Sequence, residues 1–224
     1  MSGREAILGK IRSQIGAKGG DTSRRAKVAN RLSGTPKGII PKRGQLPHFE
    51  QVELFRSRAA SVQASVTRVA SYEDVPEEVT AYLRLHNLPQ TVRTGEDIRL
   101  DAAPWEKVPT LERTFGPAIG ADTTGLSHAT AGVAETGTLV LTSGTENPTS
   151  VNFLPENHIV VITASDIEGD YESALGRIRE SYGQGRMPRT VNMITGPSRS
   201  GDIEQTILLG AHGPRNLHII IVGD

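Results

Sequence analysis

The sequence contains no cysteine, which excludes disulfide bonds, thiolate zinc sites, a cysteine nucleophile and an iron–sulfur cluster held by this chain's own thiolates. Aromatic residues make up only 4% of the 224 residues, so the core must be mainly aliphatic. No apolar run approaches the ~18–20 residues that cross a membrane. The first ten residues carry charges where a signal peptide has an apolar core. We therefore expect a cytoplasmic protein without a membrane segment.

Acidic residues are scarce at the start of the chain. Residues 1–48 hold eleven Lys and Arg against Glu5 and Asp21, a net charge of +9, and because the whole chain is neutral, residues 49–224 carry −9. Such a basic arm could pack across its own or a neighbouring acidic body, as in a homodimer, dock to a partner subunit, or bind nucleic-acid phosphates. We disfavour nucleic acid, because the arm has no stacking aromatic and no recognised motif.

Alternating helix and strand patterns predict an α/β fold. We expect helices over 3–15, 23–33, 48–63, 71–87, 170–183 and 203–210, and strands over 65–70, 91–94, 138–143, 158–163, 189–196 and 217–224. A stretch with three prolines and three glycines, 33–47, is predicted to connect a basic helical arm (1–47) to the α/β domain (48–224). Because strands and helices alternate over 158–222, we predict a largely parallel sheet with helical crossovers.

The segment 194–210 carries the strongest local signal for a binding site. A buried strand is predicted to end at Gly196, and a helix to begin near Ser200. A helix N-terminus at that edge of a sheet offers free backbone N–H groups and a partial positive charge to an anion. Ser198 and Arg199 could add donors, and Arg199 could hold a carboxylate or phosphate with two hydrogen bonds. A capped helix with a solvent-facing Arg199 explains the pattern equally well.

Glu135 is the second candidate, because it stands among small residues and leads directly into an apolar strand. A carboxylate in that position can have a raised pKa and act as an acid, base or nucleophile. The backbone of Thr136, Gly137 and Thr138 could approach a ligand closely. Spacing alone favours the alternative, a turn glutamate that accepts hydrogen bonds from backbone N–H groups.

The third candidate is His212, after the helix predicted over 203–210. A position at a helix C-terminus favours the protonated imidazole, so His212 could act as an acid, a base or a carboxylate partner. A capping or loop role is the alternative. The six histidines show no metal-binding spacing, and no dinucleotide-binding or hydrolase motif is present. A phosphate-binding loop is also excluded, since Asp202 and Ile203 stand where Lys and Ser or Thr are required.

The remaining titratable residues suggest no site. His128 lies in a stretch rich in small and polar residues, 121–132, which we predict to be a loop. Asp122, Asp166 and Asp170 form no pattern with His128 in the sequence.

Several motifs together resemble one known family. The segments AETGTLVL (134–141), NFLPENHIVVI (152–162), TGPSRSGDIE (195–204) and LGAHGP (209–214) are similar, in this order, to the lactate-utilisation protein C family, whose members contain a LUD domain, formerly a domain of unknown function. The start, SGREAILGKIRSQIG (2–16), also resembles the family's N-terminus. This resemblance implies a fold like that of the phosphosugar-isomerase and CoA-transferase superfamily, a parallel sheet flanked by helices.

The resemblance also implies a function. The chain would be a subunit of a cytoplasmic system that oxidises L-lactate to pyruvate, and it would bind a small anionic substrate, iron–sulfur partner subunits, or both. The clusters would lie on those partners, with no cofactor bound by this chain. The family positions carried over as the site are Glu135 and His212 as candidate catalytic groups and Thr136, Gly137, Thr138, Gly196, Pro197, Ser198, Arg199, Asp202 and Glu204 as candidate ligand-binding residues. Ser200 and Gly201 replace the Thr-Ala pair often found before the Asp of that motif.

Two mechanisms remain open at this point. In the subunit hypothesis, Arg199 holds the carboxylate of a 2-hydroxy acid while His212 or Glu135 takes the hydroxyl proton. In the alternative, the chain is a self-sufficient enzyme of isomerase or CoA-transferase type, with Glu135 as base or nucleophile.

Overall fold

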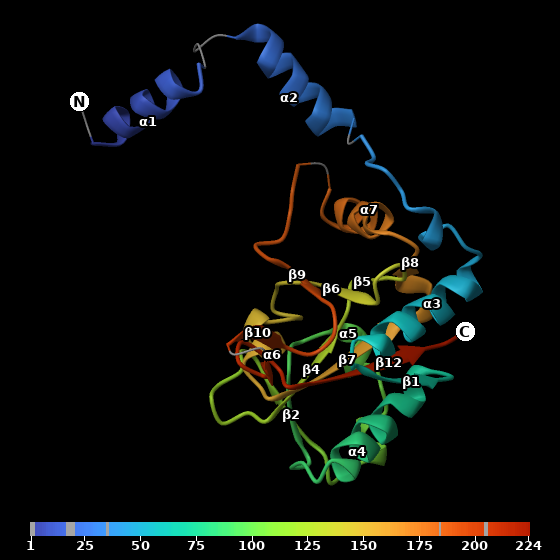
Figure 1. The fold of residues 1–224 in the computed structure, drawn as a ribbon. Coiled ribbons are helices and arrows are strands. Elements are labelled where there is room, and N and C mark those ends of the chain that lie inside the picture. The colour runs from blue at the N-terminus through green and yellow to red at the C-terminus, as the bar shows by residue number, and fades with distance from the viewer. Residues whose placement is uncertain (1–2, 17–20, 35, 184, 204–205) are drawn as a thin grey trace. The chain divides into compact units, whose positions relative to one another are not determined.

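The computed structural model describes residues 3–16, 21–34, 36–183, 185–203 and 206–224, and it divides into two compact units, Met1–Gly38 and Ile39–Asp224. The first unit holds two helices, α1 (Gly3–Gln14) and α2 (Thr22–Gly34), close to the predicted ranges (Figure 1). Neither helix has a buried residue. Residues 39–47 group with the second unit and include a short 3₁₀ turn, Lys42–Gly44.

A six-stranded parallel sheet forms the centre of the second unit (Figure 1). Its strands, in spatial order, are β1 (Ser65–Val69), β12 (Asn216–Val222), β7 (Asn157–Thr163), β4 (Thr124–His128), β2 (Thr91–Thr94) and β3 (Glu112–Phe115). All neighbouring pairs are parallel. The central strands β12 and β7 are almost entirely buried, as expected for parallel strands covered on both faces. This sheet confirms the predicted α/β fold class.

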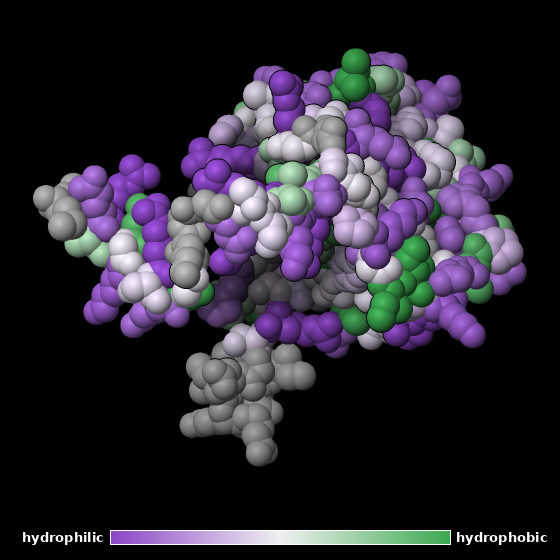
Figure 2. Space-filling view, turned by 90° about the horizontal axis from the view of Figure 1, so that it is seen from above, coloured by the Kyte–Doolittle hydropathy of each residue, from purple (hydrophilic) through white to green (hydrophobic). Residues whose placement is uncertain are grey.

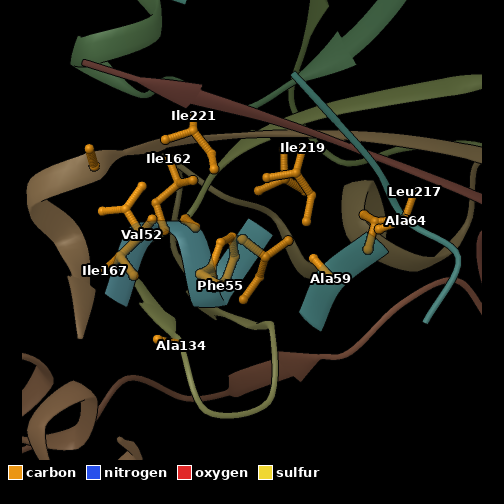
Figure 3. Close-up of a cluster of buried hydrophobic side chains, with 14 of the residues drawn as sticks. Val52, Phe55, Ala59, Ala64, Ala134, Ile162, Ile167, Leu217, Ile219 and Ile221 are labelled. Carbon is orange, nitrogen blue, oxygen red and sulfur yellow. The ribbon is translucent and has the colours of Figure 1, made fainter. Parts of the chain in front are cut away.

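Helices cover the two faces of this sheet. On one face, Val52, Phe55 and Ala59 of α3 (His48–Ser61) pack against Ile219 and Ile221 of β12 (Figure 3). On the other face, α4 (Val75–Leu85) packs against Ile220 and Val222, which alternate with Ile219 and Ile221 along β12. Because successive side chains of a strand point to opposite faces, one apolar run supplies both cores.

A second sheet lies on the other side of α3 and contributes buried residues to the core from both of its faces. Its strands, in spatial order, are β8 (Ile167–Glu168), β5 (Ala131–Val133), β6 (Thr138–Thr142) and β9 (Val191–Ile194), and α7 (Tyr171–Tyr182) covers its outer face. The segment predicted as a strand over 189–196 therefore does not join the parallel sheet, since β9 runs antiparallel to β6. The second unit is layered as α4, large sheet, α3, small sheet and α7 (Figure 1).

The helix predicted over 203–210 is wrong. The chain instead forms an antiparallel hairpin of β10 (Arg199–Ile203) and β11 (Thr206–Leu209), in which Arg199 pairs with Leu209. The misassignment has a clear reason: a short apolar run such as TILL suits a strand as well as a buried helix. No helix therefore begins near Ser200, and no helix dipole acts on His212.

The loop predicted over 121–132 is also wrong, because this stretch forms β4 and β5. Its small residues reflect close packing rather than a loop. A side chain at Gly125 would lie 2.3 Å from the carbonyl oxygen of Val151 in α6 (Thr149–Phe153). The close approach of α6 to β4 therefore requires a residue without a side chain at position 125.

The remaining short elements and the surface complete the fold. They are α5 (Ile98–Asp101) and the 3₁₀ turns Tyr72–Asp74, Trp105–Lys107 and Ala164–Asp166. On the face drawn in Figure 2, hydrophilic residues predominate and apolar residues lie in small separate groups. Within the described ranges, no helix has the length and hydropathy required to span a bilayer.

Candidate functional site

A pocket of about 260 Å³ lies at the edge of the large sheet where β7 and β12 begin. The loop after β9 and the loop before β12 form its walls, with the end of α6 beside them. Its residues are 193–199, 212–214, Asn152, Phe153, His158 and Leu217. Three of the motifs singled out in the sequence therefore meet here, although they are separated by up to 60 positions.

Ser198 ties the two pocket loops together. Its N–H donates to the carbonyl oxygen of Pro214 (2.8 Å), and its carbonyl oxygen accepts from the N–H of Gly210 (2.9 Å). Its hydroxyl accepts from the N–H of His212 (3.3 Å). These bonds place His212 beside Arg199 in the pocket wall. They also use the Ser198 N–H, so the predicted cradle of free backbone donors is absent at Ser198.

Arg199 is an exposed cation on the pocket wall. One of its terminal nitrogens donates to the carbonyl oxygen of Val62 (3.1 Å), which anchors the side chain. Among the described residues, no carboxylate forms an ion pair with Arg199. Within the described part of the chain, the other guanidinium donors therefore have no carboxylate partner. Of the neighbouring predicted residues, Asp202 lies in β10 with its side chain outside the described part, and Glu204 lies outside the described residues.

Two fully buried polar residues that sequence reasoning missed also line the pocket, Asn152 and His158. Both bind the hydroxyl of Ser127, which donates to Asn152 Oδ1 (2.8 Å) and lies 3.0 Å from His158 Nε2. Burial lowers the pKa of His158 to about 3, so its ring is neutral. The signal was present in the sequence, because both residues belong to the motif 152–162 that supported the family resemblance.

Glu135 lies outside this pocket. Its side chain is 4% exposed, and one carboxylate oxygen accepts a hydrogen bond from Nε of Arg43 (3.0 Å) and forms an ion pair with Nη2 of the same residue (3.0 Å). The partner is thus a guanidinium from the stretch 33–47 rather than the backbone N–H groups of a turn. This contact gives the basic segment one acidic partner on the chain's own body.

The turn after Glu135 supports the core instead of opening to a cavity. Gly137 has a φ of +68° and packs against the backbone of α3 at Ala59. The hydroxyl of Thr138 lies within hydrogen-bond distance of Thr136 (2.7 Å) and of Thr195 (2.7 Å), which lines the pocket. This threonine chain, together with the pairing of Leu139 with the pocket-lining Ile194, connects the motif to the pocket.

A second polar cluster occupies the opposite edge, where the parallel strands end. The hydroxyl of Tyr72 lies 2.5 Å from His128 Nε2 and 2.8 Å from Thr163 Oγ1. Nearby, Arg99 binds Asp97 (2.7 Å) and lies 3.9 Å from Asp166. His128 and Asp166 thus belong to one cluster, contrary to their scattered appearance in the sequence.

This cluster is less suited to a ligand than the pocket is. Burial and the positive charge of Arg99 lower the pKa of His128 to about 4. Its charged members neutralise one another, and no cluster of three or more metal-binding side chains occurs in the described ranges. The other acids have structural roles, since Asp122 pairs with Arg93 (2.9 Å) and Asp170 caps α7.

Comparison with known proteins gives a consistent match. A family model described as the LUD domain matches residues 52–222. Lactate utilization protein C of Shouchella clausii is 37% identical over 100 residues, which are 45% of this chain and 44% of that protein. The protein of the same name from Geobacillus kaustophilus is 32% identical over 129 residues, 54% of each chain. The chain therefore matches about half the length of these curated relatives.

A solved structure supports the fold. It is a DUF162 family protein from Deinococcus radiodurans, with a TM-score of 0.60 and 22% identity over 80% of this chain and 99% of that one.

Proposed function

Because the chain belongs to the LUD domain family, we propose that it is the substrate-binding subunit of a cytoplasmic lactate-oxidising system, and that it binds the carboxylate of lactate beside Arg199. The observation that carries this proposal is an anchored arginine on the wall of a small pocket, with no carboxylate partner among the described residues. A guanidinium forms two parallel hydrogen bonds with a carboxylate, which makes it suited to this ligand.

The size of the pocket supports a small acid. Pockets for drug-sized ligands measure ~300–1,000 Å³, and this one measures about 260 Å³. A three- or four-carbon acid would fit in it, with its carboxylate toward Arg199. His212, on the same wall, would then be available to accept the hydroxyl proton as the acid is oxidised.

The oxidation of lactate to pyruvate releases two electrons and two protons. We propose that iron–sulfur partner subunits accept the electrons, since this chain has no cysteine with which to hold such a cluster. The basic segment 1–47 is the candidate docking element for such a partner. The alternative of a self-sufficient enzyme based on Glu135 has less support, because Arg43 occupies that carboxylate away from the pocket.

The proposal is tested by calorimetric titration of the full chain with L-lactate and pyruvate. In Arg199→Ala the affinity for both acids should fall by roughly 10- to 100-fold, the value of a lost hydrogen bond to a charged group. Arg84→Ala is the matched control, because Arg84 is an exposed arginine of α4, which covers the face of the large sheet opposite α3 and does not line the pocket. Equal affinities in Arg199→Ala and the wild type would refute the assignment.

A further inference from the structure

A second cavity adjoins the pocket. It measures about 590 Å³, and it shares Phe153, His212 and Gly213 with the first. Arg199 lines the first cavity alone, whereas Glu156 and Arg215 line the second alone. The two cavities therefore form one longer cleft, and His212 lies where they meet.

This cleft is longer than lactate requires. The proposed function places the carboxylate of the acid beside Arg199 and its hydroxyl beside His212. Because His212 also lines the second cavity, the rest of a longer acid has that cavity in front of it. A three-carbon acid does not fill a space of about 590 Å³.

Glu156 and Arg215 determine which kind of chain suits the second cavity. The backbone holds them side by side, since the N–H of Arg215 donates to the carbonyl oxygen of Glu156 (2.8 Å). Their charged groups are 3.6 Å apart, which is longer than a hydrogen bond, and both side chains are exposed. Among the described residues, neither side chain forms a hydrogen bond. The pair thus offers donors and acceptors to a ligand while its charges cancel.

A neutral chain that carries hydroxyl groups matches this pair. Each hydroxyl can donate to the carboxylate of Glu156 and accept from the guanidinium of Arg215. A second carboxylate on the acid would meet Glu156 as well as Arg215 and gain little. An alkyl chain would leave both charged groups without a partner.

Phe153 supplies the apolar part of the cleft. It is 41% exposed at the end of α6, and its ring lies close to Gly213, where a β-carbon would be 3.7 Å from Cδ1. The C–H groups of a hydroxylated chain can pack on such a ring through dispersion. One side of the chain would then contact Phe153 while its hydroxyls face the charged pair.

We propose that the cleft accepts 2-hydroxy acids whose carbon chain carries further hydroxyl groups, with the carboxylate beside Arg199 and the chain against Phe153 and the Glu156–Arg215 pair. This inference rests on the proposed function, because Arg199 must hold the carboxylate for the chain to be placed. It extends the substrate class from lactate to polyhydroxy acids.

The experiment compares three acids by calorimetric titration of the full wild-type chain. D-mannonate has six carbons, further hydroxyls and the carbon-2 configuration of L-lactate, and (S)-2-hydroxyhexanoate has the same length and configuration without those hydroxyls. Mannonate should bind at least tenfold more tightly than either L-lactate or 2-hydroxyhexanoate, because hydrogen bonds to charged groups are strong and the analogue without hydroxyls leaves those groups unpaired.

Two variants test the residues. Glu156→Ala and Arg215→Ala, each checked for folding by circular dichroism, should bring the ratio of mannonate to lactate affinity close to one. Arg56→Ala is the matched control and should leave the ratio unchanged, because Arg56 is an exposed arginine of α3 that also pairs with a glutamate, Glu53 (2.9 Å), but lines neither cavity.

The outcomes separate this inference from the proposed function. Mannonate that binds no more tightly than lactate, with lactate binding weakened in Arg199→Ala, would overturn the inference and leave the proposed function standing. An unchanged ratio in folded Glu156→Ala and Arg215→Ala would also overturn it. Mannonate binding that needs Arg199, Glu156 and Arg215, without any lactate binding, would support the inference and refute lactate as the substrate. If none of the three acids binds, both proposals fail.

Discussion

Replacing Gly137 by alanine should sharply destabilise the second unit, although Gly137 lies in a motif that the sequence presents as a candidate site. The turn between β5 and β6 gives this residue a φ of +68°. A β-carbon there would lie 2.4 Å from the backbone nitrogen of Ala59 and 2.7 Å from the carbonyl carbon of Arg58. Because both atoms belong to the backbone of α3, and Ala59 is packed in the core, neither can give way easily.

The size of the effect follows from two costs. An L-residue with a side chain in the left-handed region costs roughly 1–2 kcal/mol. Overpacking a close contact adds about 1–3 kcal/mol. The sum is about 2–5 kcal/mol, which is a large part of the ~5–15 kcal/mol that stabilises a typical domain.

Urea unfolding, followed through the fluorescence of Trp105, the only tryptophan, measures this change. With a denaturant slope of ~1–3 kcal/mol per molar urea, the midpoint should fall by ~1–5 M. Gly176→Ala is the matched control, because Gly176 lies within α7 with nothing near its missing side chain. That variant should be as stable as the wild type or more stable, by up to ~1 kcal/mol. A wild-type midpoint for Gly137→Ala would refute the packing argument.

Two further perturbations test other parts of the second unit. Arg43→Ala should lower the unfolding free energy by about 1 kcal/mol, a value limited by solvent screening because the Arg43 side chain is 58% exposed. The same substitution should cost less stability in a Glu135→Gln background. Equal losses in both backgrounds would show that Arg43 and Glu135 do not stabilise the fold as an ion pair. Acid should also destabilise the fold. In the folded chain the pKa values of His128 and His158 are about 4 and about 3, below the value of about 6.5 expected in the unfolded chain. As the pH falls from 6.5 toward 4, the unfolded chain therefore binds more protons than the folded chain does. Each histidine should remove roughly 1.4 kcal/mol per pH unit in that window, and urea midpoints that stay constant from pH 7 to pH 5 would argue against two buried neutral rings.

Much of the fold could be predicted from local patterns. The strands β7 and β12 contain runs of four Ile and Val residues, and the helices α3, α4 and α7 show apolar residues at helical spacing. Strand β4 escaped prediction because its small polar residues look like a loop. Their burial is imposed by α6, which packs on Gly125 from a later part of the chain.

The segment 206–209 shows where local sequence patterns fail to predict secondary structure. Its short apolar run carries no period, so local sequence does not distinguish a strand from a helix. Antiparallel pairing with β10 through backbone hydrogen bonds decides the outcome.

The amino-acid sequence by itself determined the class of the fold, the family, and the motifs in which a site could lie, because these depend on residue types and their order. Only the tertiary structure decided which motifs meet. It brought Arg199 and His212 together through the hydrogen bonds of Ser198, and it placed Glu135 against Arg43 instead. It also placed Asn152 and His158 at the pocket, since a histidine at the start of a strand looks like any core histidine until its surroundings are known. Pairing in space depends on contacts between distant segments, and those contacts exist only once the chain has folded.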